Sequence, residues 1–299
     1  MIHDSAPAIL DIKEDFIFKQ VFGTEKNKNV LMSFLNAVLR GNPKIVDLEL
    51  LNTDAPKLVK DGKGIRLDVK AKVSDDTFCD IEIQCRNSND LPERAIQYLA
   101  RMLNENAKKK GKEEETSDIQ DYHYPKVIGI WILGQNATNR KSAISEASMV
   151  FHKNDRDDYQ IMSDKARVLF IELNKFKPNT IDKKNMLDLW LSFLKDPEDR
   201  ELRHVDKTVD QAIETLRFIS ADKKMREIYI AREETKRDHD SEVINTARLA
   251  REEGREEGIA EERKKNVLNM KSKGLDNKFI AECLNISEGD VENILADNS

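Results

Sequence analysis

The feature that most constrains the fold is the regular alternation of side chains between Arg66 and Gln84, RLDVKAKVSDDTFCDIEIQ. Apolar residues occupy one parity and charged residues the other, which is typical of two half-buried strands joined by a short turn. The charged parity includes two carboxylates, Asp68 and Glu82. The pattern therefore predicts a hairpin with one face in a core and an acidic pair on the other face.

The register of this hairpin depends on the length of its turn. With a three-residue loop, opposite positions sum to 150, so that Val69 faces Ile81 and Asp68 faces Glu82. With a five-residue loop, Lys70 faces Glu82 and Asp68 becomes a diagonal neighbour of Glu82. Both registers keep the two carboxylates on one face, because side chains alternate with a period of two.

Two interpretations of the acidic pair remain open on the residues alone. Like charges directly opposite each other destabilise a sheet, and a divalent cation such as Mg²⁺ removes that penalty when Asp68 and Glu82 share it. Arg66 and Lys70 would then help to hold a phosphate. In the second interpretation the face is solvated, and Lys70 pairs with Asp80 across the strands.

The order of the elements predicts an α/β fold in which helices cover a sheet. Three amphipathic helices and five strands are expected in the first 175 residues, in the order α-β-β-β-α-β with a further strand after an irregular stretch. The expected helices cover residues 13–22, 29–39 and 92–110, and the expected strands cover residues 45–51, 64–73, 77–85, 126–133 and 166–173.

The remainder of the chain is predicted to be helical. Short amphipathic helices are expected in residues 176–230, and residues 231–265 form a charged segment in which twenty of thirty-five residues carry charge. That segment is either a solvated helix or a disordered arm. Its repeated REEG places Gly254 and Gly258 one turn apart, where two helices can approach closely. Residues 266–299 have the outline of a helix-turn-helix, which either reads DNA or packs against a neighbour.

Composition narrows the class of protein further. The formal net charge of −6 argues against nucleic-acid binding by bulk electrostatics, but it is compatible with an enzyme that grips a few phosphates. The three cysteines show no Cys-x-x-Cys spacing, so no disulfide framework or zinc knuckle is predicted. No segment is long and apolar enough to be a signal peptide or a membrane span. We therefore expect a cytoplasmic protein with no membrane partner.

Several of these pieces together resemble a known family. The helix DFIFKQVFG, Asp68, the Glu82-x-Gln84 pattern and the helix RAIQYLARM are similar to the PD-(D/E)XK nuclease superfamily. More narrowly, they resemble its Rpn branch of recombination-promoting nucleases, also labelled transposases. The resemblance covers residues 11–173 and implies a restriction-endonuclease-like core at residues 1–175.

The resemblance also implies a set of site residues. Asp68 and Glu82 would hold Mg²⁺, with Mn²⁺ as a substitute, and the carbonyl of Ile83 would be a further ligand. Asp15, or Glu14 beside it, matches an acidic residue that some members add from the first helix. Gln84 stands where the superfamily usually has a lysine, although glutamine is typical of the Rpn branch.

The glutamine shifts part of the chemistry to other groups. A lysine can stabilise negative charge, whereas Gln84 can only hydrogen-bond. The metal, or a nearby lysine such as Lys70 or Lys72, would therefore contribute more to activation of the attacking water. Arg94 and Gln97 of the following helix are candidate contacts to phosphate, and Tyr98 is expected in the core. Lys19 either contacts the DNA backbone or is an ordinary surface residue.

The sequence thus predicts a Mg²⁺-dependent DNA endonuclease acting in recombination, on mobile elements or in defence. DNA is the expected partner, and the C-terminal helices are the expected contact of a homodimer. A competing hypothesis is a catalytically inactive DNA-binding or recombination accessory protein that acts through its C-terminal helices. The sequence is also compatible with an interaction scaffold and with a helix-turn-helix regulator.

Overall fold

The chain forms two compact units, residues Met1–Ile230 and Ala231–Ser299. The computed structural model describes residues 8–51, 69–73, 77–84, 90–107, 124–152, 159–177 and 181–297. Asp68, Arg66 and the turn of the predicted hairpin lie outside the described residues.

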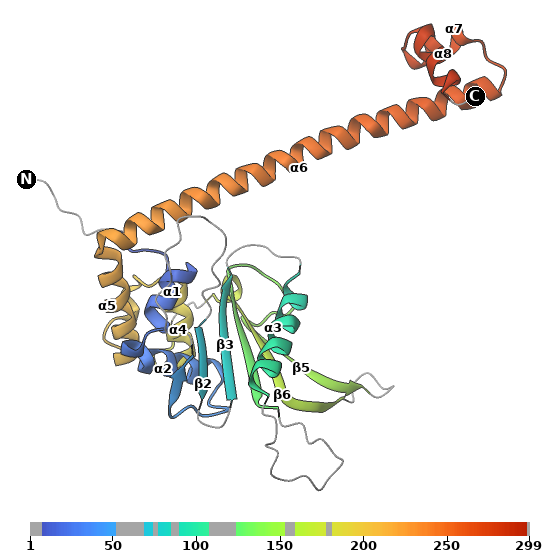
Figure 1. Cartoon of the computed structure of the whole chain (residues 1–299). Helices are drawn as coiled ribbons and strands as arrows, with labels where there is room; N and C mark the ends of the chain where they lie inside the picture. The colour runs from blue at the N-terminus through green and yellow to red at the C-terminus, as the bar shows by residue number, and fades with distance from the viewer. Residues whose placement is uncertain are drawn as a thin grey trace, which may run out of the picture. The chain divides into compact units, whose positions relative to one another are not determined.

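A six-stranded mixed sheet organises the first unit, in the spatial order β1-β2-β3-β4-β6-β5 (Figure 1). Strand β2 runs antiparallel to both β1 and β3. Strands β3, β4 and β6 run parallel to one another, and β5 runs antiparallel to β6. The strands are β1 (Leu48–Leu50), β2 (Val69–Val73), β3 (Thr77–Gln84), β4 (Lys126–Leu133), β5 (Ile144–His152) and β6 (Tyr159–Glu172).

The pairing of β2 with β3 has the register of the shorter loop. Val69 lies opposite Ile81 and Ala71 lies opposite Cys79. All four side chains are buried, because this parity of both strands packs into the main hydrophobic core. The predicted apolar face and the three-residue-loop register are therefore confirmed for the described part of the hairpin.

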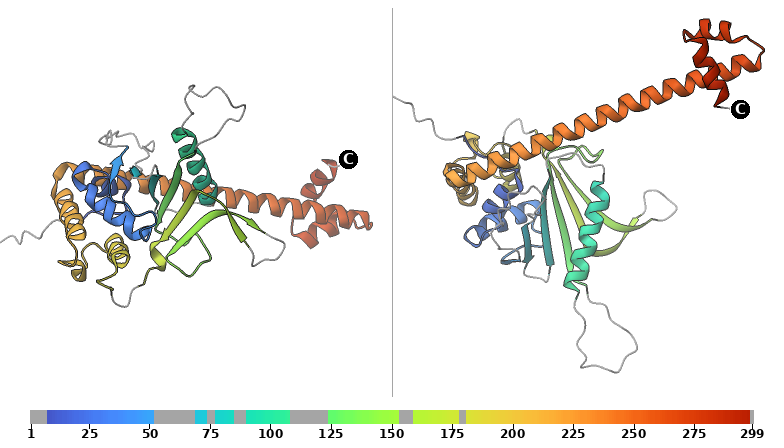
Figure 2. Two further views of the ribbon diagram at one scale, coloured as in Figure 1. Left: turned by 90° about the horizontal axis from the view of Figure 1, so that it is seen from below. Right: turned by 45° about the horizontal axis from the view of Figure 1, so that its top comes forward.

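Helices cover both faces of the sheet (Figures 1 and 2). The main core lies between one face and the helices α1, α2, α4 and α5, whereas α3 packs on the other face. The α-helices of this unit are α1 (Asp15–Phe22), α2 (Lys28–Val38), α3 (Leu91–Asn106), α4 (Met186–Lys195) and α5 (Lys207–Ala221), and the 3₁₀ turns are Glu25–Asn27, Leu173–Lys175 and Arg200–Leu202.

Aromatic side chains join the helices of the main core. The ring of Phe22 lies 5.2 Å from that of Phe34, 5.6 Å from that of Trp190 and 6.3 Å from that of Phe193, measured between centroids. Helices α1, α2 and α4 therefore meet at one residue. The tilted and edge-on ring geometries are those that aromatic pairs prefer.

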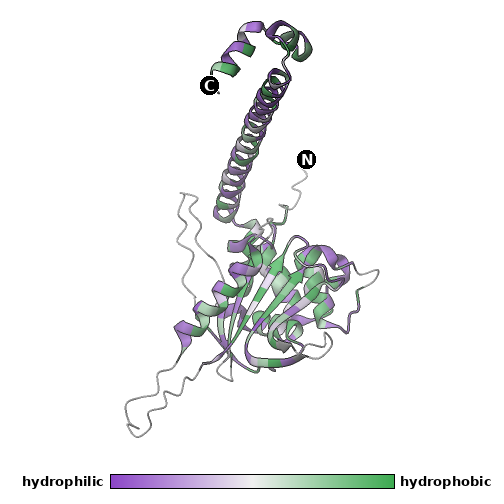
Figure 3. Cartoon of the chain, turned by 90° about the vertical axis from the view of Figure 1, so that its right-hand side faces the viewer, coloured by the Kyte–Doolittle hydropathy of each residue, from purple (hydrophilic) through white to green (hydrophobic). Residues whose placement is uncertain are grey.

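The second unit contains most of a long helix and two short ones. Helix α6 (Lys223–Ser272) begins in the first unit and continues into the second, where it is mainly hydrophilic (Figure 3). Helices α7 (Asn277–Leu284) and α8 (Glu288–Ala296) pack with its end around Val267, Ile280 and Val291. The charged segment lies in α6, and the predicted helix-turn-helix region contains the end of α6 followed by two short helices.

The caps of the two short helices are encoded locally. Asp276 accepts a hydrogen bond from the amide of Phe279 (2.9 Å) at the start of α7. Ser287 and Asp290 form a reciprocal capping box at the start of α8. Asn285 adopts the left-handed conformation that ends α7. Helix α8 carries three acids and no lysine or arginine, which does not favour contact between this helix and phosphates.

Two strand predictions from the sequence are wrong. Residues 144–152 form β5, where the sequence predicts an irregular stretch, and β6 begins at Tyr159 rather than near Ala166. Strand β5 lies at the sheet edge, where several of its side chains are exposed and hydrophobic alternation is weak. The predicted restriction-endonuclease-like α/β core with a helical C-terminal region is confirmed. Among the described helices, none has the length and apolarity needed to span a membrane.

Candidate functional site

The candidate site is built on the face of β3 that points toward α3. Because side chains alternate along a strand, Phe78, Asp80 and Glu82 share this face, while Cys79 and Ile81 enter the main core. Phe78 packs in a hydrophobic cluster with residues of α3, β4 and β6. The core therefore fixes which carboxylates of β3 lie beneath α3.

Glu82 lies half-buried beside an aromatic residue that α3 covers. Its partner in the parallel pairing with β4 is Trp131, which is 1% exposed. The guanidinium carbon of Arg94 on α3 lies 5.5 Å from the centroid of a Trp131 ring, and Tyr98 packs against the same residue. Glu82 and Arg94 thus border a common aromatic side chain. The prediction that Tyr98 belongs to the core is confirmed, since it is 3% exposed.

Asp80 is a second acid on this face. The sequence predicts it only as the solvated partner of Lys70. It lies opposite Lys70 on β2, as the three-residue-loop register predicts. Asp80 is nevertheless only 2% exposed, since α3 lies above the face and its neighbour on β4 is Gly129. The interpretation of a solvated face is therefore wrong at Asp80. Directly opposite side chains of a sheet lie about 4.5–5.5 Å apart at Cβ, so Lys70 provides a nearby compensating charge.

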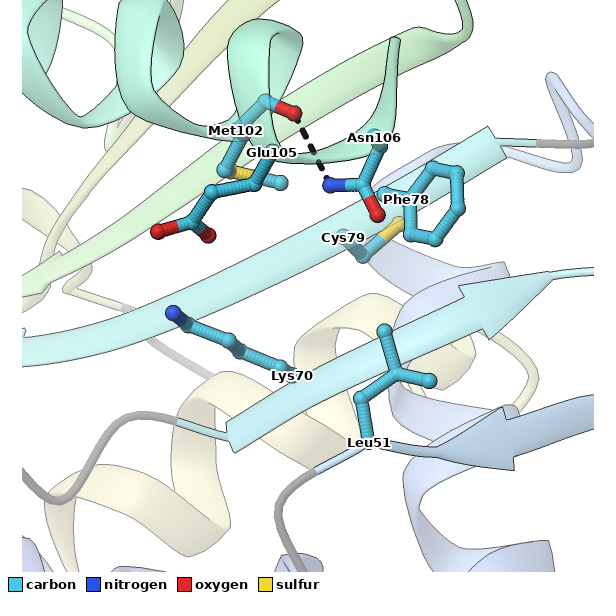
Figure 4. Close-up of a pocket in the computed structure, with 7 residues that line it drawn as sticks. All are labelled: Leu51, Lys70, Phe78, Cys79, Met102, Glu105 and Asn106. Carbon is cyan, nitrogen blue, oxygen red and sulfur yellow. Dashed lines mark hydrogen bonds between the residues drawn. The ribbon is translucent and has the colours of Figure 1, made fainter. Parts of the chain in front are cut away.

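A cavity of about 290 Å³ lies next to Lys70, between the edge of the sheet and the end of α3. In Figure 4 the ammonium group of Lys70 and the carboxylate of Glu105 extend toward each other across it. Asn106 donates a hydrogen bond to the carbonyl of Met102 (2.8 Å) at the end of the helix. The cavity is lined by Leu51, Lys70, Phe78, Cys79, Met102, Glu105 and Asn106.

The other predicted site residues lie on three different elements or at their ends. Asp15 is the first residue of α1, and its carboxylate accepts a hydrogen bond from the amide of Phe16 (2.6 Å). Gln84 is the last residue of β3, directly after the half-buried Ile83. Gln97 is exposed on α3. The described residues therefore bring Glu82, Lys70 and Arg94 to one face.

Lys19 is not the surface residue that one interpretation required, because it is 5% exposed. Its stem runs along the turn after α1, where Gly23 makes a close approach. A Cβ at Gly23 would lie 2.9 Å from the Lys19 carbonyl oxygen and 3.2 Å from a methyl group of Val69. Glycine is therefore required for α1 to pack against the start of β2, the residue after Asp68.

The described residues contain only some of the donors that a metal site would need. They contain no group of three or more His, Cys, Asp or Glu side chains able to hold an ion. Glu82 and the carbonyl of Ile83 are oxygen donors of the type that Mg²⁺ prefers, and Mg²⁺ often uses only one or two carboxylates together with water and substrate phosphates. This donor chemistry fits a divalent metal if Asp68 adds the second carboxylate.

A second buried acid, Glu172, organises the loop between β4 and β5. Its carboxylate accepts hydrogen bonds from the amides of Ala137 (2.6 Å) and Thr138 (2.9 Å) and from the Thr138 hydroxyl (2.7 Å). The ammonium group of Lys175 lies 2.7 Å from it. Burial raises the pKa of Glu172, but the ion pair and the hydrogen bonds outweigh it and hold the pKa below its ordinary value.

The sequence offers no reason to single out Glu172. It stands at the end of a predicted apolar strand, in FIEL, where an acidic residue is ordinarily just exposed to solvent. Its partners Ala137 and Thr138 lie about 35 residues earlier. Only the parallel pairing of β4 with β6 brings the two segments together. The one local signal is the i,i+3 spacing of Glu172 and Lys175 in the turn after β6.

Comparison with known proteins gave one positive result. A family model described as PD-(D/E)XK nuclease family transposase matches residues 12–247. The matched segment includes α1, the β2–β3 pair and α3, and it contains every site residue predicted from the sequence. No curated protein and no solved structure matched the chain.

The Glu172 network predicts a pH-dependent contribution to stability. Glu172→Gln should lower the free energy of unfolding at pH 7 by roughly 1.5–3 kcal/mol, because hydrogen bonds to a charged group are lost. Since the pKa of Glu172 is lowered in the folded state, wild type should be more stable than Glu172→Gln above pH about 4.5. This difference should disappear as the pH falls through the folded-state pKa. Urea unfolding at pH 7 and pH 4 measures the difference in the free energy of unfolding.

Glu146→Gln is the matched control, because the Glu146 carboxylate is 43% exposed and pairs with Arg167 near the surface. Its effect should stay below about 1 kcal/mol. Equal losses for the two variants at pH 7, or a Glu172→Gln loss that does not shrink at pH 4, would contradict the assigned role of Glu172.

Proposed function

Because the chain belongs to the PD-(D/E)XK nuclease family transposases, we propose that it is a Mg²⁺-dependent endonuclease that hydrolyses DNA phosphodiester bonds. Membership supports a nuclease-type hydrolase, a DNA substrate and a divalent metal, which nucleases of this family generally use. We place the activity in residues 1–175, with Asp68 and Glu82 as the metal ligands. A role in recombination, on mobile elements or in defence is part of the same proposal.

The observation that carries the proposal is the register of β2 and β3. Val69 pairs with Ile81, and this is the register in which the sequence places Asp68 opposite Glu82. Glu82 itself lies half-buried on the face beneath α3, next to Trp131. A carboxylate held in a sheet between packed layers is positioned with little freedom, as a metal ligand needs.

A bound Mg²⁺ ion would lower the pKa of a coordinated water and neutralise charge on the phosphate. The residues of the chain would bind and orient around it. Asp68, Glu82 and the Ile83 carbonyl would supply oxygen ligands, and Asp15 would add an acid from α1. Gln84 would hydrogen-bond the attacking water or the phosphate, because it has no charge to offer.

The positive charge that Gln84 lacks is proposed to come from the same face. Lys70 lies on β2 at the next position of the polar parity after Asp68, and Arg94 lies above Trp131 on α3. Both would contact phosphate oxygens, and Arg66, which lies outside the described residues, would be a third cation. Lys72 extends over the ring of Phe78, 5.9 Å from its centroid, farther along the strand. Gln97, which is exposed on α3, remains a secondary candidate for DNA contact, whereas Lys19 is too buried for that role.

Plasmid cleavage tests this proposal. Supercoiled DNA is incubated with wild type in Mg²⁺, Mn²⁺, Ca²⁺ or EDTA, and with Glu82→Gln and Asp68→Asn in Mg²⁺. Wild type should nick the plasmid only with Mg²⁺ or Mn²⁺. Each variant should lose at least about 100-fold in rate, since removing a residue that merely orients a ligand already costs 10–100-fold.

Glu214→Gln serves as the control, because Glu214 is an exposed acid on α5 in the helical layer of the opposite face. Its rate should equal that of wild type. Equal nicking by wild type and Glu82→Gln would exclude Glu82 from the reaction. Absence of nicking by wild type with every metal would favour the non-catalytic DNA-binding or accessory protein instead.

We further propose that the chain forms a homodimer through α6. Between residues 237 and 265 every residue of this helix is exposed. Between residues 243 and 258 a narrow stripe of the helix carries small or β-branched apolar side chains and two glycines, and a Cβ added at either glycine would meet no other atom within 4 Å. Glycine within an exposed helix costs about 0.5–1 kcal/mol, which close helix–helix contact would offset. This stripe consists of Val243, Ala247, Ala250, Gly254 and Gly258.

Sedimentation equilibrium tests the dimer with two variants that add the same acid. Ala250→Glu lies on the stripe and should shift the wild-type dimer to monomer. Asn245→Glu lies on the far side of the helix and should leave the dimer intact. A monomeric wild type at about 50 μM, or equal dissociation of both variants, would contradict the proposed contact.

A further inference from the structure

A second cavity, of about 400 Å³, lies at the β5 edge of the sheet, opposite the β1 edge. Its floor is formed by β5 and β6, and its rim is the loop that Glu172 organises. No residue predicted from the sequence as part of the site contributes to it. Its lining includes Thr138, Asn139, Arg140, Ser145, Glu146 and Phe170.

The sheet register relates this cavity to Glu82. Glu82 pairs with Trp131, Trp131 pairs with Phe170, and Phe170 pairs with Ser145. The four side chains therefore form one row across the face that α3 covers in part. Three strand spacings of about 4.8 Å place Ser145 roughly 14 Å from Glu82. Helix α3 packs on β4 and β6, so the cavity opens on the side of the helix away from β3.

The rim of the cavity is held in place by several hydrogen bonds. Thr138 donates its amide and its hydroxyl to Glu172, and its hydroxyl oxygen accepts the amide of Arg140 (3.3 Å). Lys175 donates to the Thr138 carbonyl (2.6 Å) and to its hydroxyl oxygen (3.0 Å). The backbone from which Asn139 and Arg140 project is thus fixed before any ligand binds.

The groups around the cavity suit a nucleotide. Arg140 and Lys141 are exposed, and within the described part of the chain neither side chain forms a hydrogen bond or ion pair. The hydroxyl oxygen of Ser145 is buried and has no hydrogen-bond partner among those residues. The ring of Phe170 is partly buried in the floor. An aromatic face binds a base by stacking, and a guanidinium group binds a phosphate.

The acid that lines this cavity does not oppose such a ligand. Glu146 lies on the other parity of β5 from Ser145, and its two oxygens accept hydrogen bonds from Arg167 at 2.7 and 3.1 Å. Its charge is therefore largely compensated. The local balance of the rim is positive, in contrast to the net charge of −6 of the whole chain.

We propose that this cavity binds one nucleotide of a single DNA strand, with the base against Phe170 and the phosphate at Arg140 and Lys141. The inference rests on the proposed function and narrows its substrate, since a base can enter the cavity only when it is unpaired. The metal ligands would then act about 14 Å away, a distance of about four base-pair steps of duplex. The enzyme would bind DNA best where a strand is already open.

Binding rather than cleavage tests this proposal. The anisotropy of a labelled single-stranded oligonucleotide and of a duplex of equal length is measured with the full chain in EDTA. Arg140→Glu/Lys141→Glu should weaken single-strand binding about tenfold or more and should reduce its salt dependence, because phosphate contacts are lost. Phe170→Leu should weaken single-strand binding about tenfold and duplex binding less, because a stacking contact is lost.

Lys183→Glu/Lys184→Glu is the matched control. These two lysines are also adjacent and exposed, but they precede α4 in the helical layer on the other face of the sheet. This control should bind as wild type does. If both charge reversals weaken single-strand binding equally, binding depends only on the overall charge and the proposal is overturned. Wild-type affinity in Arg140→Glu/Lys141→Glu would also overturn the proposal. A lack of measurable single-strand binding by wild type would overturn it too.

The outcome is independent of catalysis. If wild type binds the single strand through Arg140 but no metal supports nicking, the cavity stands and the nuclease proposal fails. If nicking depends on Glu82 while both charge reversals bind alike, the nuclease proposal stands and the cavity is excluded.

Discussion

The antiparallel pairing of β2 with β3 is the constraint on which the candidate site depends. Val69, Ala71, Cys79 and Ile81 are at most 1% exposed, so slipping the register by one residue would expose this entire apolar set. The same packing keeps Glu82 and its neighbours beneath α3. Hydrophobic burial on one side of the sheet thus positions the polar chemistry on the other side.

The parallel strands extend this arrangement across the first unit. Because β3, β4 and β6 run in one direction, their carboxyl ends lie at the same end of the sheet. Gln84, the loop after β4 and Glu172 all lie at that end. Glu172 lies at the end of a buried strand and fixes a loop through two backbone amides. The proposed metal ligands and the proposed nucleotide cavity therefore lie on the same face of the sheet, with an aromatic cluster that includes Trp131 between them.

Local pattern predicted much of this fold, and tertiary contacts account for the rest. The alternation in β2 and β3 and the periodicity of α3 could be recognised because each buries one continuous face. Strand β5 could not, since as an edge strand it depends on β6 for pairing. The burial of Asp80 depends on α3 and on Gly129, which lie far from it in the sequence, so no local pattern predicts it. The roles of Asp68 and Glu82 came from family resemblance, and they remain predictions.

The proposed activity requires that the carboxylates of the β2–β3 pair share a divalent ion. Calorimetric titration with Mn²⁺ in the absence of DNA, on wild type and Glu82→Gln, measures this without requiring catalysis. We predict Mn²⁺ binding by wild type and an affinity at least about tenfold lower in Glu82→Gln. Equal affinity and stoichiometry for the two proteins, or no binding by wild type, would contradict a metal site at Glu82.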